Sequence, residues 1–314
     1  MTLRLYAALV LLFAPAMWAD ATIHYHTDVK ASAIIPAAAV DEALAGIRDM
    51  EIRIKGNKAS SSQGNITSIT DWMTQDLILV DAPHKRFAKV PADQYAEQIK
   101  SAIPAIPEQA RAALASMKTS LESRSTGRTA TIQGIETEEH EFVVNIDMAL
   151  PAGTPASSPF MKIVMQMWTP KPEEAQRVPA LQEFKNYITS AGSTLNPVGM
   201  IKQVLSGLPG LGDNLSAMVE EISKNGSISL RMHMELSVPF LAALAQQSPP
   251  KPGELPAGFD PNAPLMQMTQ ELVELSSDAL DDAIFQVPAD YQSVPLEEIL
   301  QGAASIPTLP QFKH

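Results

Sequence analysis

Three pairs of methionines are the side chains whose type and spacing best suit a specific chemistry in this sequence. The pairs are Met165 and Met167, Met232 and Met234, and Met266 and Met268. Residues two apart on a β-strand point to the same face, so each pair would present two thioethers together, and soft thioethers suit Cu(I). Methionine is also an ordinary core residue, and Leu230, Leu236 and Val238 share a predicted face with the second pair. That setting favours the wall of an apolar core or cavity over a copper site.

Histidines and acidic residues offer weaker candidates for a metal site. His24 and His26 would share a strand face, and with His140 or Glu139 they could in principle hold zinc. No third ligand follows at a fixed spacing, so we interpret these histidines as solvent-facing. The acidic run Glu136–Glu141 could bind a cation, although such runs are more often solvated hairpin ends. We therefore predict no metal site and no cofactor.

The sequence contains no G-x-S-x-G, P-loop or paired-carboxylate motif. The segment Gly207–Gly212 resembles a phosphate-binding loop, but it contains a proline and has no preceding strand, which indicates a turn between helices. We predict no catalytic residue and a protein that is not an enzyme. A hydrolase whose site is assembled from scattered residues is a lesser alternative.

The composition excludes several classes of protein. The chain of 314 residues has 23 Lys and Arg against 35 Asp and Glu, and this net charge of -12 disfavours binding to nucleic acid or to an anionic membrane surface. It has no cysteine, so disulfides and acylation at an N-terminal cysteine are excluded. The stability of an exported form would depend on its core alone.

The first residues have the features of a secretory signal. Arg4 precedes the apolar run Leu5–Phe13, and small residues follow, with cleavage expected after Ala16, Ala19 or Ala21. We expect a signal peptide over residues 1–21 and a soluble periplasmic or extracellular protein. An uncleaved anchor is the alternative, although the apolar run is shorter than the roughly 20 residues that span a bilayer.

The remaining pattern predicts one α+β domain over residues 22–294, with a large curved antiparallel sheet. Its central element is a hairpin over Arg128–Asp147, in which Gly134 and Glu136–Glu139 lie near the bend and Phe142, Val144 and Ile146 share one face. Other predicted strands are Ala21–Ser32, Met50–Lys55, Ala59–Trp72, Asp76–Val80, Arg86–Val90, Met161–Thr169, Ser227–Val238, Met266–Ser276 and Ala283–Val287.

Helices are predicted over about 92–123 and 172–224. The first block contains Ala92–Ala102 and Glu108–Ser123, where Ala110, Leu114, Met117 and Leu121 form one apolar stripe. Residues 248–264 are rich in proline and indicate a loop, and residues 295–314 indicate a C-terminal helix and tail.

Several motifs in this order resemble one family. They are Ile78–Val90 (ILVDAPHKRFAKV), Gly127–Val144 with its I-x-G, Val164–Pro170 (VMQMWTP), Gly226–Glu235 at the start of a strand, and Ala283–Val294 (AIFQVPADYQSV). Over about residues 22–294 the chain is similar to the bacterial exported proteins grouped as domain of unknown function 4412. It departs from them where Glu136–Glu138 stand in a segment that usually carries a cysteine. The resemblance implies a fold of the LolA/LolB lipoprotein-carrier type, an open half β-barrel with helices packed on its concave side, but no catalytic residues.

These observations lead to a predicted binding space for a lipid or other hydrophobic molecule. The residues expected to line it by apolar contact are Phe142, Val144, Ile146, Ile163, Met165, Met167, Leu230, Met232, Met234 and Leu236. The alternative is that these faces form a filled core. The protein would then be a structural or interaction module of the cell envelope.

Overall fold

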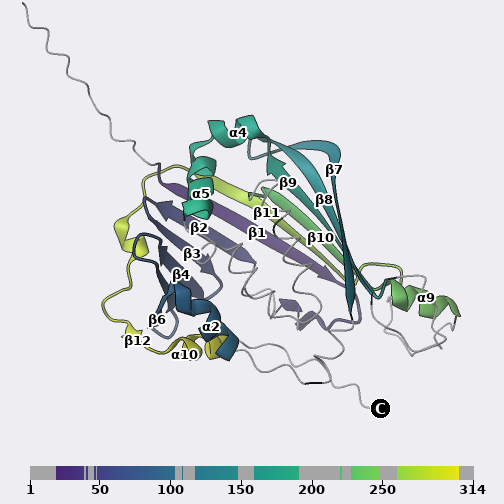
Figure 1. Cartoon of the computed structure of the whole chain (residues 1–314), viewed down its shortest axis with the longest axis horizontal. Helices are drawn as coiled ribbons and strands as arrows, with labels where there is room; N and C mark the ends of the chain where they lie inside the picture. Colours follow the sequence, from purple (N-terminus) through teal and green to yellow (C-terminus); the bar gives the residue numbers. More distant parts are fainter. Residues whose placement is uncertain are drawn as a thin grey trace, which may run out of the picture.

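The computed structural model is mostly β, with one open sheet of twelve largely antiparallel strands and a few short helices (Figure 1). It describes residues 19–38, 40–41, 46, 48–102, 108, 117–147, 159–190, 220, 228–247 and 260–303. The strands are β1 (Ala21–Ala31), β2 (Asp49–Lys55), β3 (Lys58–Gln63), β4 (Ile66–Asp71), β5 (Asp76–Asp81), β6 (Arg86–Pro91), β7 (Lys118–Ile132), β8 (Ile135–Asp147), β9 (Met161–Pro170), β10 (Arg231–Ser237), β11 (Met266–Ser276) and β12 (Gln292–Ser293).

The sheet consists of two meanders joined at β1. Strands β1 to β6 lie side by side in chain order, and β7 to β11 do the same. Antiparallel pairing of β1 with β11 joins the two halves, with Thr27 opposite Gln270. The short strand β12 pairs in parallel with β6, so β12 and β7 are the two edges of the sheet.

Helices pack on one side of the β1–β6 half. They are α2 (Ala92–Ala102), α5 (Pro179–Ser190) and α10 (Leu296–Ala303), and α4 (Pro172–Arg177) leads into α5. Leu181, Phe184 and Tyr187 of α5 share the main apolar cluster with Ile23 and Tyr25 of β1. This cluster is the principal core of the protein, and its burial is the main force that holds the helices on the sheet.

A smaller apolar cluster covers the opposite side of the β1–β6 half of the sheet. The 3-10 helix η1 (Asp282–Phe285) places Phe285 against Ile69 of β4 and Val80 of β5. The Asp281 carboxylate accepts a hydrogen bond from the Ala283 backbone amide 2.9 Å away, which caps this helix. Residues 283–287 were predicted to form a strand, but residues 283–285 belong to this helix. The cap and the contacts of Phe285 stabilise a helical turn there.

The hairpin of β7 and β8 turns earlier than expected. Its bend is the pair Gln133 and Gly134, both with positive φ, at 50° and 74°. Glu136–Glu139 were predicted near the bend, but they lie inside β8. The predicted helix over Glu108–Ser123 is also wrong at its end, because residues 118–123 belong to β7 and pair with β8.

Other expectations agree with the structure or fall outside it. The helix over Ala92–Ala102 and the strand over Met266–Ser276 are confirmed. The helix α9 (Pro239–Gln247) follows β10 and was not predicted. The signal segment up to residue 18, the helix expected at 198–205, the helix expected at 213–224 except for residue 220, and most of the proline-rich loop lie outside the described residues. Within the described part of the chain, no helix has the length and apolar character that a membrane span requires.

Candidate functional site

The pairing of β8, β9, β10 and β11 brings the predicted lining residues together on one side of the sheet. Directly opposite residues in antiparallel strands point to the same side. Three rows run across the strands: Val144, Ile163, Leu236 and Met266; Phe142, Met165, Met234 and Met268; and His140, Met167, Met232 and Gln270. Ile146, which lies opposite Met161, continues the surface beyond the first row. Leu230, two residues before Met232, continues it beyond the third row. We call this surface the methionine face.

Thioethers dominate this surface. Seven of the 15 methionines of the chain lie on it, in three neighbouring strands: Met161, Met165, Met167, Met232, Met234, Met266 and Met268. Phe142, Met165 and Met167 form a buried cluster, against which Leu121 and Met232 pack. The same side of the sheet carries Tyr25 on β1, so the methionine face continues the side that the helices cover.

Burial divides the ten predicted residues into two groups. Phe142, Val144, Ile146, Met165, Met167 and Leu230 are buried. Ile163, Met232, Met234 and Leu236 are only half-buried. The surface is therefore packed at β8 and more accessible towards β10.

One end of the methionine face is polar. In the third row, His140 lies opposite Met167, and Gln270 lies opposite Met232. Gln270 also donates a hydrogen bond through Nε2 to the Thr27 hydroxyl at 3.4 Å. An elongated molecule on this face would meet apolar side chains along the first two rows and polar groups at the two ends of the third.

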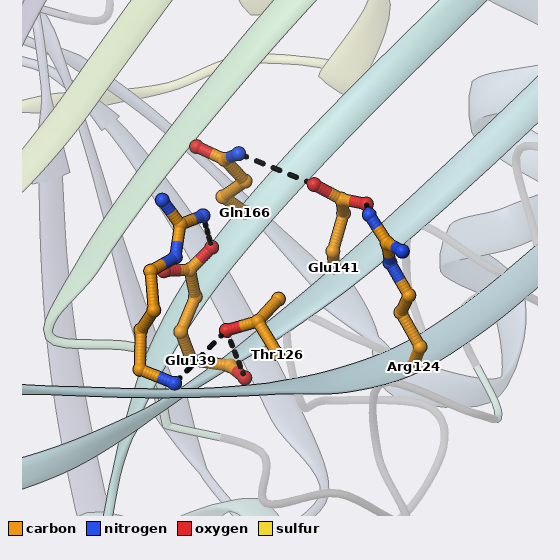
Figure 2. A network of polar contacts seen from close by, with 6 residues as sticks. Arg124, Thr126, Glu139, Glu141 and Gln166 are labelled. Atoms are coloured by element: carbon orange, nitrogen blue, oxygen red, sulfur yellow. Dashed lines mark hydrogen bonds and ion pairs between the residues drawn. The ribbon is translucent and has the colours of Figure 1, made fainter.

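The opposite side of the same strands is a charged face, carrying Glu139, Glu141, Arg231 and Glu271. Figure 2 shows its part over β7, β8 and β9. Arg124 donates to Glu141 from Nε at 2.9 Å and from a terminal nitrogen at 2.5 Å, and Gln166 donates to the other carboxylate oxygen at 3.3 Å. Burial alone would raise the pKa of Glu141, but these hydrogen bonds outweigh it and hold the pKa below its usual value.

Glu139 is the most enclosed charge on the charged face. Its residue is 0% exposed, and the Arg128 guanidinium donates to its Oε1. Arg128 lies within an irregularity in β7 between Ser125 and Thr129, where Gly127 takes a φ of 72°. The Thr126 hydroxyl accepts a hydrogen bond from the Arg128 backbone amide at 3.2 Å (Figure 2). Within the described residues, Oε2 of Glu139 has no hydrogen-bond partner. The bent edge strand thus supplies the counter-charge for a buried carboxylate.

A row of aromatic and charged residues crosses the charged face from β8 to β2. Register places Glu139, Trp168, Arg231, Glu271, His26 and Asp49 successively opposite one another. The Arg231 guanidinium lies 5.7 Å from the Trp168 ring centroid and donates to Glu271 at 2.5 Å. His26 Nδ1 lies 2.7 Å from the Asp49 carboxylate, a hydrogen bond that raises the pKa of His26.

Two cavities open on the charged face. One of about 570 Å³ is lined by Arg124, Glu141, Val143 and Lys162, among others, and one of about 340 Å³ by His26, Asp28, Gln133 and Glu271, among others. None of the ten predicted residues lines either cavity. This face was not predicted as a site from the sequence, although the alternation of Glu139 and Glu141 with uncharged residues on β8 was a signal for it.

The zinc alternative is not supported by the geometry. His26 and His140 lie on opposite sides of the sheet, and three strands separate His26 from Glu139. His24 and His26 instead both approach Asp49, at 3.7 and 2.7 Å. In the described part of the chain, no group of three His, Asp or Glu side chains is arranged to hold a metal ion.

The comparisons with known proteins give no relative from which a function could be transferred. No protein-family model matches the chain, and no curated protein matches its sequence.

Proposed function

We propose that this is an exported, non-enzymatic protein that binds a lipid or another hydrophobic molecule on the methionine face. The observation that carries the proposal is the alignment of Met165, Met234 and Met268 in one row. A largely aliphatic row lies on one side of it, and the row that ends in His140 and Gln270 lies on the other. In this proposal the sheet is a half-barrel of the lipoprotein-carrier type, with its helices on the concave side. That geometry is what the resemblance to the family of domain of unknown function 4412 implies, and the open, largely antiparallel sheet is consistent with it.

The chemistry of methionine fits such a role. Its unbranched side chain adapts to an irregular apolar surface, and its thioether is polarisable, so a methionine-lined site accepts hydrophobic ligands of varied shape. The half-buried Met232 and Met234 are where a bound chain would remove most apolar surface from water. The polar third row would then contact the polar end of the ligand.

A second candidate function has an observation of its own. Phe142, Val144 and Met165 are already buried, as they would be in a filled core. The sheet would then be a scaffold for interactions in the cell envelope, and its charged face would be the surface available for contacts.

The test is mass spectrometry of the protein exported in a bacterium and purified without refolding, under native conditions and after organic extraction. The variant Met232→Glu with Met234→Glu places two charges in the half-buried part of the methionine face. We expect a lipid or other hydrophobic molecule with the unmodified protein and none with this variant, because burying a carboxylate beside an apolar chain is unfavourable.

The matched control is Met73→Glu with Val273→Glu. These are the large hydrophobic residues that are exposed among the described residues, at 75% and 43%, and the change in net charge is the same. Circular dichroism must show that both variants are folded. If the unmodified protein is empty and also takes up no fluorescent fatty acid or phospholipid, the binding proposal is wrong and the scaffold function is favoured.

A further inference from the structure

We infer that the methionine face also contains a binding site for Cu(I) or a chemically similar soft monovalent cation. The ligands are the thioether sulfurs of Met165, Met167, Met232 and Met234. In the sequence, each pair taken alone was better explained as the wall of an apolar core or cavity than as a copper site. Cross-strand pairing joins the two pairs, since Met165 lies opposite Met234 and Met167 lies opposite Met232.

The geometry allows four thioethers to converge. Directly opposite Cβ atoms in an antiparallel pair lie about 4.5–5.5 Å apart, and each methionine adds three rotatable bonds between Cα and its sulfur. Met165, Met167 and Met232 already belong to one packed cluster. The rotatable bonds of these four side chains therefore allow their sulfurs to turn towards a single ion between β9 and β10.

The choice of ligands points to a soft ion. Thioethers select Cu(I), whereas zinc prefers thiolate, imidazole and carboxylate ligands. The four ligands are neutral, so an entering monovalent ion keeps its charge, and a monovalent ion costs less to desolvate than a divalent one. Met232 and Met234 are half-buried and leave a route for entry from β10.

The position of the site also explains why methionine occurs where leucine would fill the same space. Methionine loses more side-chain entropy on burial than leucine. Four such residues at adjoining register positions are therefore a less stable choice for a purely structural surface. Coordination of an ion gives these residues a role that leucine cannot perform.

The experiment uses the full-length exported protein with Ag(I) as a redox-inert probe, titrated calorimetrically in chloride-free buffer and observed by native mass spectrometry. Cu(I) is then measured anaerobically by competition with bicinchoninate. We expect a single ion to bind, and the variant with Met165, Met167, Met232 and Met234 each changed to leucine to bind more than about tenfold more weakly. Zn(II) should not compete.

The leucine variant separates this inference from the proposed function. Leucine conserves volume and apolar character, so lipid uptake should persist while ion binding is lost. The control Met73→Leu, in the exposed turn between β4 and β5, should bind Ag(I) as the unmodified protein does. If the fourfold variant does not fold, Met232→Leu and Met234→Leu are measured singly, and each should weaken binding.

Three results would overturn the inference. They are no binding of Ag(I) or Cu(I) to the unmodified protein, unchanged binding in the folded leucine variants, and equal binding of Zn(II), which would show that the site does not depend on soft ligands.

Discussion

Replacing Arg128 by alanine should destabilise the fold by about 2–3 kcal/mol. Removing one partner from a fully buried ion pair typically costs about 3–5 kcal/mol, because the other charge remains buried without compensation, whereas exposed pairs contribute about 0–1 kcal/mol. The Arg128–Glu139 pair is intermediate between a fully buried and an exposed ion pair. Glu139 is 0% exposed, but the Arg128 side chain is 59% exposed and is already partly solvated.

Arg124 provides a matched comparison on the same strand. Its partner Glu141 keeps a hydrogen bond from Gln166 when Arg124 is removed. The Arg124→Ala variant should therefore lose only about 1 kcal/mol, at the upper end of the range for an exposed ion pair, because the Arg124 side chain is 72% exposed. Both variants replace an arginine of β7 by alanine. The difference between their losses in free energy of unfolding therefore reports how deeply the two carboxylates, Glu141 and Glu139, are buried.

The assay is urea unfolding followed by tryptophan fluorescence, in which Trp168 lies directly opposite Glu139. Adding Glu139→Leu to Arg128→Ala removes the uncompensated charge, and this double variant should be more stable than Arg128→Ala alone by about 1 kcal/mol or more. A loss of less than about 0.5 kcal/mol for Arg128→Ala would refute the reasoning, because that is the size of an ordinary surface substitution.

Three further predictions concern the core, the hairpin turn and pH. Phe142→Ala should lower the free energy of unfolding by about 3–5 kcal/mol through loss of buried surface and a cavity, while Met73→Ala should stay within about 0.5 kcal/mol; urea unfolding measures both, and equal effects would contradict the assigned core. Gly134→Ala should cost about 1 kcal/mol from its φ of 74° alone, since no atom lies within 4 Å of an added Cβ; a neutral result in the same assay would show that the turn rearranges. The hydrogen bond to Asp49 raises the pKa of His26. The contribution of this pair to the free energy of unfolding should therefore be complete below about pH 6.5 and be lost as the pH rises through the pKa of His26 in the folded protein. An NMR titration should show a lower His26 pKa in Asp49→Asn, and an unchanged value would exclude this pair as the cause.

Local patterns predicted the elements whose side chains alternate in sequence. The return strand with Phe142, Val144 and Ile146 on one side is confirmed, because a period of two follows directly from strand geometry. The helix over Ala92–Ala102 is also confirmed. In both elements, the information lies within a few consecutive residues.

Features that depend on distant pairing were not predicted correctly. The spacing of Met117 and Leu121 suggested a helix, but residues 118–123 pair with β8, and this pairing overrides the local preference. Glu139 was expected in solvent near a bend because its charge was considered without Arg128. The sequence likewise showed each methionine pair separately, and only the register across β9, β10 and β11 unites them.

The joining of the two meanders at β1 has a consequence for the order of folding during synthesis. β1 can pair with β2 as soon as residue 55 has left the ribosome, but its other edge waits for β11, which ends at Ser276. Contacts this distant in sequence form slowly, and an open strand edge can pair with another chain. Nascent chains therefore carry an exposed pairing edge through most of translation, and protection of β1 from premature association is a requirement of this topology.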